Sequence, residues 1–431
     1  MMARFSFTVS VLAVLASVGH AWLPSVDDHH AGARKLVDRN GFSLFNDTTF
    51  GHEKRWLPAS GKIRGVNLGS LFVYEPWIAS NTWTNTMQCT GSGYNSEFDC
   101  MTKLGAGTGD ATFQKHWNTW VTAADFDEMI SYGLNTVRIP LGYWMDEGIV
   151  YWDSEHFPRG GADVLRTVCG WASDRGMYII LDMHGAPGAQ VAQNSFTGQF
   201  ASSPGFYQDY QFNRATSFLS WLRRFVHDNN EMRNVGMIEV VNEPLQNQGS
   251  QTQYMRQTYY PAAYNAIRST EQSLGITPNN YVHVQFMNTY WGSGNPQQYL
   301  SNNYFAAYDD HRYLKWSPDA SDVSHAGYLR VSCHDNRSGP DSPTIVGEFS
   351  LSVPDNVQWN SDWAPSNNVA FYKQWFAAQV MSYETYAMGW VFWTWKSELG
   401  DYRWSYRDAV AAGVIPRDLN SIASSGACNG Y

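Results

Sequence analysis

GMIEVVNEP, residues 236–244, is a short apolar run that ends in the polar pair Asn242-Glu243. A near-continuous apolar run of this length is typical of a strand buried on both faces, as strands are in parallel sheets. Seven more runs of this kind occur along the chain, and helix-like segments separate most of them. These runs are KIRGVNLG (62–69), LNTVRIPLGYW (134–144), MYIILDMHG (177–185), YVHVQF (281–286), AAYDDHRYLKW (306–316), PTIVGEFS (343–350) and AMGWVFWTW (387–395).

The helix-like segments between the runs complete a repeated strand–helix pattern. In 117–132, Thr122 and Asp125 have the spacing of an N-terminal capping pair. Eight such units with no second core predict an α/β protein with a single (β/α)8 TIM barrel. Two long segments, 75–116 and 186–205, are predicted to be elaborated βα loops. The predicted helices lie in 117–132, 161–175, 206–229, 251–273 and 367–385.

Most of the apolar runs carry a polar or aromatic residue that we assign to the carboxyl end of a strand. In a parallel barrel these ends gather around one pocket. One such residue alone is usually structural, but the same feature on six strands is hard to explain by packing. The residues are Arg138, His184, Asn242 with Glu243, His311 with Tyr313, Glu348, and Trp393.

Glu243 and Glu348 are the residues that decide the predicted chemistry. From 243 to 348 is the length of three βα units of about 35 residues, so we place them on strands four and seven. Either Glu alone could be a buried ion pair with Arg138. Two of them across one pocket favour an acid/base and a nucleophile acting on a glycosidic bond. Glu243 is the predicted acid/base and Glu348 the predicted nucleophile.

The other strand-end residues are predicted to support this pair. Arg138 should contact Glu348 and lower the pKa of its carboxyl, and Tyr313 could donate to the same group. Asn242 is placed to bond a sugar hydroxyl, and Trp393 could stack under a sugar ring. For His184 and His311 the alternatives are a substrate-positioning role, orientation of the acid/base, or a satisfied position in the core.

Composition and motifs narrow the class of function further. Aromatic residues make up 15% of the chain and include 19 Trp, which suits contact with the apolar faces of sugars, although core packing accounts for many of them. The net charge of −10 disfavours nucleic acid and anionic membranes as partners. The chain has no G-x-S-x-G, P-loop, G-x-G-x-x-G, H-E-x-x-H or C-x-x-C motif, so we expect no cofactor and no metal.

The N-terminus has the pattern of a secretory signal, with Arg4 before the apolar run 5–18. We expect a signal peptide at 1–21, a pro-segment at 22–55 ending in Lys54-Arg55, and a catalytic domain at 56–431. The alternative for Lys54-Arg55 is an ordinary surface loop. The protein is then expected to be secreted and extracellular, either free or associated with the cell wall, and to act as a monomer.

An oxidising route permits disulfides among the five cysteines. Cys89 and Cys100 are a plausible local pair, and the odd count leaves at least one thiol unpaired within the chain; the remaining connectivity is open. N-glycosylation sequons occur at Asn46 and Asn336. Asn46 would be lost with the pro-segment, so Asn336 is the better acceptor.

The ordered set of strand-end residues resembles glycoside hydrolase family 5 from residue 62 to about 413. Its Arg, His, Asn-Glu, His-x-Tyr, Glu and Trp are all present, and the resemblance implies a retaining mechanism. Within that family the chain is most similar to fungal endo-β-1,6-glucanases, which implies fungal cell-wall β-glucan as the substrate. The stretches that carry this closer similarity are RGVNLGSLFVYEPWI (64–78), FTGQFASSPGFYQDYQ (196–211) and GWVFWTWKSELGDYRWSY (389–406).

Three other functions stay open at this point. Exo-β-1,3-glucanases of the same family have the same catalytic set, and linkage choice depends on loop shapes that the sequence does not give. A barrel that binds glucan without cleaving it is disfavoured by the complete polar set. A wall-anchored structural protein would need a hydrophobic C-terminal tail, and the printed sequence ends in SIASSGACNGY, so we expect no lipid anchor.

Overall fold

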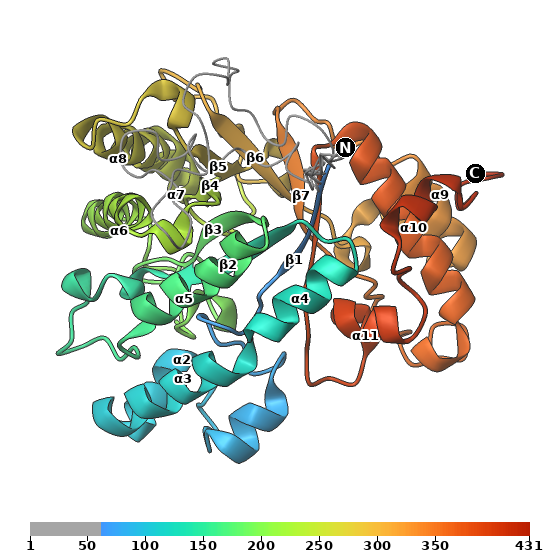
Figure 1. Ribbon diagram of the computed structural model, residues 1–431, viewed down its shortest axis with the longest axis horizontal. Helices are drawn as coiled ribbons and strands as arrows, with labels where there is room; N and C mark the ends of the chain where they lie inside the picture. The colour runs from blue at the N-terminus through green and yellow to red at the C-terminus, as the bar shows by residue number, and fades with distance from the viewer. Residues whose placement is uncertain (1–61) are drawn as a thin grey trace, which may run out of the picture.

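The computed structural model describes residues 62–431, in which eight strands form a closed barrel in the order β1-β2-β3-β4-β5-β6-β7-β8 (Figure 1). All neighbouring pairs are parallel, and the pairing of β1 with β8 closes the barrel. The predicted (β/α)8 fold is confirmed. The strands are β1 Ile63–Asn67, β2 Thr136–Gly142, β3 Tyr178–Gly185, β4 Val235–Glu239, β5 His283–Met287, β6 Ala306–His311, β7 Thr344–Phe349 and β8 Gly389–Phe392.

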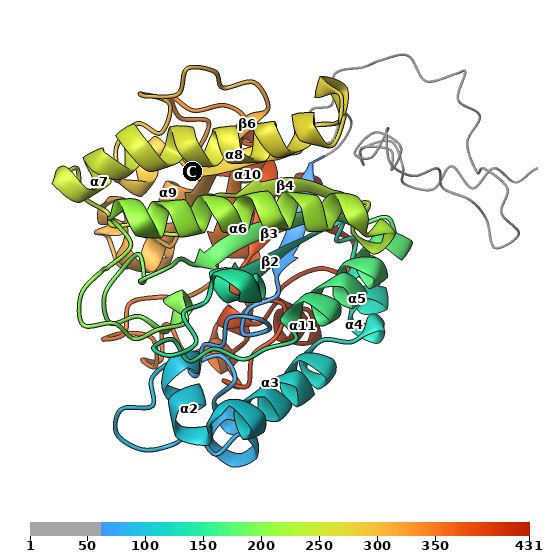
Figure 2. The ribbon, with the colours of Figure 1, turned by 90° about the vertical axis from the view of Figure 1, so that its left-hand side faces the viewer.

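Each strand falls on one of the predicted apolar runs. Every residue of β2 and β3 is buried, because one face of each strand points into the barrel and the other packs against helices. The helices form an outer layer around the strands (Figure 2). They are α2 Glu97–Leu104, α3 Ala106–Trp120, α4 Ala123–Ser131, α5 Gly161–Asp174, α6 Asp209–Asp228, α7 Ser250–Tyr254, α8 Tyr260–Ser273, α9 His325–Cys333, α10 Val369–Tyr386 and α11 Tyr406–Ala411.

The predicted single helix 117–132 is two helices in the structure. Helix α3 ends at Trp120 and α4 begins at Ala123, with Thr122 as the N-cap residue. The Thr122 amide donates to Asp125 at 2.8 Å, which is one half of a capping box. The cap prediction is therefore confirmed, and the cap itself explains why the helix could not run through this position.

The prediction of an elaborated loop at 75–116 was partly wrong. The segment includes α2 and most of α3, which both views place at the lower edge of the molecule. Gly and Thr residues hide the helical period, but Phe113 and Trp117 are four positions apart and both buried. The predicted disulfide between Cys89 and Cys100 is present. It cross-links two positions within this same segment.

The other cysteines divide into a second disulfide and one thiol. Cys333, at the end of α9, pairs with Cys428 near the C-terminus, a connection that the sequence did not determine. Cys169 on α5 is buried and free, which matches the prediction of one unpaired thiol. Asn336 is exposed, as a glycan acceptor must be, and its glycosylation stays a prediction.

Two features complete the account of the chain. The predicted signal peptide (1–21), the predicted pro-segment (22–55) with its Lys54-Arg55 pair, and the Asn46 sequon lie outside the described residues. Among residues 62–431, no helix has both the length and the apolar character needed to span a bilayer.

The barrel interior is layered. Inward-facing apolar side chains fill one end, and they come from six of the eight strands. The next inward positions along the strands carry polar and charged groups, because alternate residues of a strand face the same side. This change from apolar to polar brings the functional groups to the carboxyl ends of the strands. The apolar layer consists of Ile63, Tyr178, Ile180, Met237, Ala307, Ile345 and Val391.

Candidate active site

A cavity of about 530 Å³ opens at the carboxyl ends of the strands. Glu243 and Glu348 both line it, so the structure brings the two predicted carboxylates to one pocket. Of the other predicted residues, His184, Asn242, Tyr313 and Trp393 line it as well. Arg138 and His311 lie beneath the cavity and reach it through the glutamates that they contact.

Glu243 lies four residues beyond the end of β4 and has a backbone φ of +40°. A positive φ is uncommon for a residue other than glycine and costs free energy, so the surrounding structure must hold it. Three hydrogen bonds hold this turn: the Asn242 amide donates to Met183 O at 3.0 Å, Gln190 Nε2 to Asn242 O at 2.9 Å, and Tyr259 Oη to Val240 O at 2.6 Å.

Glu348, on β7, is held through both of its carboxylate oxygens. Arg138 Nη1 donates to Oε1 at 3.0 Å, and Tyr313 Oη donates to Oε2 at 2.7 Å. Both predicted contacts are confirmed. Arg138 lowers the pKa of Glu348 as predicted, and His311 lowers it too. Burial, which the prediction left out, has the larger effect and raises the pKa above its ordinary value.

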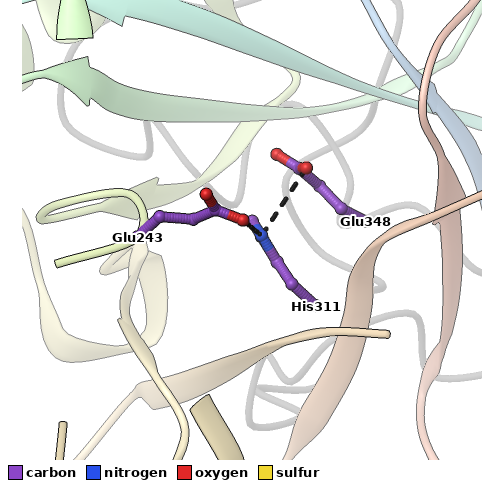
Figure 3. A group of neighbouring side chains, drawn as sticks. All are labelled: Glu243, His311 and Glu348. Atoms are coloured by element: carbon purple, nitrogen blue, oxygen red, sulfur yellow. Dashed lines mark hydrogen bonds and ion pairs between the residues drawn. The ribbon is translucent and has the colours of Figure 1, made fainter. Parts of the chain in front are cut away.

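His311, the last residue of β6, links the two glutamates. Its Nδ1 donates to Glu243 Oε1 at 2.7 Å and lies 3.6 Å from Glu348 Oε2 (Figure 3). Within this trio, a carboxylate oxygen of Glu243 and one of Glu348 lie within 4.8 Å of each other. Of the roles considered for His311, this position favours orientation of the acid/base.

Arg138 lies deeper than the sequence predicted. We placed it at a strand end, but it is the third residue of β2, and its guanidinium is fully buried inside the barrel. Its long side chain still reaches the cavity residues from this depth. Nη1 donates to Glu348 Oε1, and Nη2 donates to Glu239 Oε2 at 2.8 Å. Its geometry is that of an arginine shared among several carboxylates.

His184, Asn242 and Trp393 line the cavity together with the two glutamates. His184 Nδ1 is 2.6 Å from Asp182 Oδ2, and its ring stacks on Trp393 with centroids 5.5 Å apart. Asn242 Oδ1 accepts from Arg138 Nη2 at 2.8 Å, which turns the amide nitrogen of Asn242 away from the arginine. That nitrogen has no partner among residues 62–431 and borders the cavity.

Glu243, His311 and Glu348 also have the spacing of a possible metal site, since each offers one ligand atom within 4.8 Å of the others. The surrounding charges oppose that use. Arg138 already donates to Glu348, and the pKa of His311 is held well above its ordinary value because Glu348 and Asp309 outweigh the effect of burial. A protonated imidazole cannot bind a metal. The residues therefore fit a proton-transfer site better than a metal site.

Sequence reasoning missed an acidic layer under the cavity. Asp182, Glu239 and Asp309 are fully buried and surround Arg138, at 3.0, 2.8 and 3.6 Å respectively. A signal was available, because Asp182 and Asp309 stand two residues before His184 and His311 on the same strands. Residues two apart on a strand share a face, so these aspartates had to point into the barrel with the histidines.

Glu75, which was not among the predicted site residues, also lines the cavity with the two glutamates. Burial raises the pKa of Glu75 to about 7, although His184 and the Trp77 indole, which donates to it at 2.9 Å, oppose the rise. Nothing in its sequence context marks it, since it follows a strand by eight residues in a segment taken for a loop.

The cavity rim is rich in tryptophan. Trp316 and Trp359 are each 65% exposed and Trp77 is 36% exposed, so large apolar faces are open to solvent next to the glutamates. Trp404 also lines the rim and packs edge-on against Trp77 with centroids 5.1 Å apart. The expectation that some of the tryptophans lie on the surface is confirmed at this rim.

Comparisons with known proteins agree with this geometry. The family model "Cellulase (glycosyl hydrolase family 5)" matches residues 101–399. The chain is 57% identical over 411 residues to "Glucan endo-1,6-beta-glucosidase B" of Emericella nidulans, covering 95% of this chain and 97% of that protein. It is 28% identical to a "Glucan 1,3-beta-glucosidase" of Blumeria graminis, covering 84% and 88%. The crystal structure of a rutinosidase from Aspergillus niger superposes with a TM-score of 0.64 at 20% identity, covering 83% and 98%.

Proposed function

Because the chain belongs to glycosyl hydrolase family 5, we propose that it is a retaining endo-glycosidase that hydrolyses β-1,6-glucosidic bonds of fungal cell-wall glucan. The observation that carries the mechanism is the approach of the two glutamates within 4.8 Å. Retaining glycosidases hold their two carboxyl groups about 5 Å apart, whereas inverting ones leave room for a water at about 6.5–9.5 Å.

In the proposed reaction, Glu348 attacks the anomeric carbon while Glu243 donates a proton to the leaving oxygen. The glycosidic C–O bond breaks and a covalent bond to the Glu348 carboxylate forms. Glu243, now ionised, then takes a proton from water, which displaces Glu348 and releases the sugar with its original configuration. The hydrogen bonds from Arg138 and Tyr313 support this role, because they favour the charged form of Glu348.

The remaining cavity residues suit a sugar bound above the glutamates. The unpartnered amide nitrogen of Asn242 can donate to a hydroxyl next to the scissile bond, where contacts strengthen in the transition state. The indole of Trp393, stacked on His184, offers a face to the same sugar. His184 is thereby fixed by Asp182 on one side and by the indole on the other.

Linkage is the finer part of the proposal. The relative at 57% identity acts, by its name, on endo-1,6 bonds, and the relative at 28% identity acts on 1,3 bonds. The much higher identity to the first relative, over 95% of this chain, favours 1,6 cleavage over the exo-1,3 alternative.

A panel of three polymers tests the function. The purified enzyme is incubated with pustulan, laminarin and carboxymethyl-cellulose, and the products are sized. Short gentio-oligomers from pustulan alone are expected. Glucose from laminarin would favour the exo-1,3 alternative, and binding to pustulan without release of reducing sugar would identify a non-catalytic barrel.

We also propose that the protein is secreted. The two disulfides are consistent with an oxidising route, and the apolar run 5–18 supplies the signal. N-terminal sequencing of the enzyme purified from culture medium identifies the mature N-terminus. Trp56 is the expected first residue if the Lys54-Arg55 site is processed, and a start close after residue 21 would mean that the pro-segment is retained.

The exposed tryptophans at the rim should hold the polymer beyond the reacting sugar. We expect Trp316→Ala to raise KM for pustulan by about tenfold, the equivalent of one lost aromatic–sugar contact near 1.4 kcal/mol. kcat/KM for a small aryl glycoside should change much less. Tyr210→Ala is the matched control, because Tyr210 is 50% exposed but does not line the cavity. Equal losses on both substrates would contradict a role in binding the polymer.

The activity should follow a bell-shaped pH profile. Glu348 must be ionised to attack, and burial raises the pKa of its carboxyl, so the acid limb of kcat/KM should lie above the ordinary value of 4.5. Activity is lost as the pH falls through this limb, because the nucleophile becomes protonated. It is lost again at higher pH, when the acid has given up its proton. Initial rates from pH 3 to 9, after checks for unfolding, measure both limbs; a flat profile between pH 4 and 8 would rule out this pair of roles.

A further inference from the structure

Four buried carboxyl groups converge on a single guanidinium below the cavity. Arg138 lies 2.8–3.6 Å from carboxylate oxygens of Asp182, Glu239, Asp309 and Glu348. The first three side chains are 0% exposed, and Glu348 is 6% exposed. Burying a carboxylate is costly unless a counter-charge or a proton neutralises it. One arginine cannot balance four carboxylates, so this layer needs a second cation, a retained proton, or both.

His311 is positioned to be the second cation. Its Nε2 is 3.4 Å from Asp309 Oδ2, while its Nδ1 faces Glu243 at 2.7 Å and Glu348 at 3.6 Å. From the β5–β6 connection, the uncharged ring of Trp291 packs against it at a centroid distance of 5.6 Å. Burial disfavours its charge, but Glu348 and Asp309 outweigh burial and hold the pKa of His311 well above its usual range.

Glu239 is the group that can keep a proton. Its Oε2 accepts from Arg138, but its Oε1 is buried and has no hydrogen bond among residues 62–431, and the Oδ2 of Asp309 has only the longer contacts with His311 at 3.4 Å and Arg138 at 3.6 Å. Both carboxyl groups lie against the Arg138 guanidinium, and each changes the pKa of the other. Burial raises the pKa of Glu239 well above its ordinary value, and Arg138 only partly opposes this. A proton on Glu239 would give both oxygens a partner.

Gly347, on β7, fixes the position of Asp309. Its amide donates to Asp309 Oδ1 at 2.8 Å, and a Cβ added at this glycine would lie 2.0 Å from the same oxygen. Any side chain at position 347 would collide with this carboxylate, so only glycine leaves room for Asp309 here. The Asp309 carboxylate occupies that space and directs its second oxygen toward His311 and Glu239.

We propose that Asp309 is a positioning residue of this enzyme, which holds His311 as an imidazolium against Glu243 and Glu348 while Glu239 remains a neutral acid that donates to Asp309. The catalytic relevance rests on the proposed function, since it assumes the roles of the two glutamates. The charge states do not depend on it. With Glu239 neutral, the buried layer carries one fewer negative charge, and the imidazolium links it to the reacting groups.

The charge on His311 can be measured without substrate. Histidine-labelled protein is titrated by NMR, and the His311 signal is identified by its loss in His311→Gln. We expect this signal to stay in the imidazolium form well above pH 6.5, where an unperturbed histidine titrates. In Asp309→Asn its titration should move down by one unit or more. A wild-type signal that titrates near pH 6.5 overturns the proposal, even if the variant does not fold.

The pH profile tests the link to catalysis. In Asp309→Asn, the basic limb of kcat/KM on pustulan should move to lower pH by about one unit, because the active form is now lost when His311 loses its proton. KM should change little. A limb that stays in place or moves to higher pH contradicts the positioning role. If the wild type does not cleave pustulan, the proposed function fails, whereas the NMR result still decides the charge state.

Asp310→Asn is the matched control. Asp310 is the next residue on β6, is equally buried, and faces the other side, where Arg337 pairs with it at 2.5 and 2.8 Å. This substitution should lower the melting temperature and leave the His311 titration and the pH profile in place.

The protonation of the Glu239 carboxyl group can be measured separately. Infrared difference spectra of wild type against Glu239→Gln should show the carbonyl band of a protonated carboxyl at neutral pH. Absence of that band overturns the assignment of the proton.

Discussion

Glu348→Ala should lower kcat on pustulan by about 10⁴-fold or more, because the variant has no group to form the covalent intermediate. The protein should still fold, since the substitution removes one of several carboxylates that crowd around Arg138. Azide fits into the space left by the side chain and should attack the same carbon directly. The product should be a glycosyl azide of inverted, α configuration.

The stereochemistry of that product is the decisive measurement. Substrate with an activated aryl leaving group is incubated with azide, and the anomeric coupling of the product is read by NMR. A β-azide would show that Glu348 is not the nucleophile. Turnover near the wild-type rate without azide would end the assignment altogether. Glu97→Ala serves as the control, because Glu97 is also a buried glutamate but bonds the Tyr74 amide at 2.9 Å and does not line the cavity.

Glu243→Ala should lower kcat on pustulan by about 10²–10⁴-fold, the usual contribution of general acid catalysis. The loss in the first step should be much smaller on a dinitrophenyl glycoside, because that leaving group departs without a proton. Water then lacks a base, so the glycosyl-enzyme should accumulate and give a burst of the phenol. Azide needs no base and should release the sugar as the β-azide, opposite in configuration to the product of the nucleophile variant.

The combination of substrate dependence and product configuration separates this role from a structural one. A variant that had merely lost its fold would fail equally on both substrates and would show no burst. If the burst is absent while the first step remains fast, Glu243 does not act as the base. The basic limb of the pH profile should also flatten on the activated substrate, since the group responsible for it is gone.

The fold could be predicted because the strands of this barrel are buried on both faces and therefore appear as uninterrupted apolar runs. The same property locates the strand ends, where Glu243 and Glu348 stand out as charged residues after apolar ones. Closure of the barrel brings both to the same face, although the position of Glu243, four residues beyond β4, also depends on the turn that Gln190 holds.

Other features depended on information that the sequence does not display locally. The depth of Arg138 follows from strand register, which one run does not reveal. The direction in which the pKa of Glu348 shifts depends on a balance of large opposing effects, because burial raises it while His311 and Arg138 lower it. Helix α2 has only eight residues, and the first half of α3 has two glycines and few apolar positions, so their period was too weak to detect.

The second disulfide has a consequence for producing the protein. In βα barrels the helices return toward the amino ends of the strands, so Cys333, at the end of α9, lies with its partner Cys428 on the side away from the catalytic mouth. In a reducing bacterial cytoplasm this disulfide would not form, so the C-terminal tail would not be cross-linked to α9. The active site would keep its geometry and its activity. Enzyme produced in this way would be active after purification but would lose activity faster on warming. Export to the periplasm, where the disulfide can form, would restore its thermal stability.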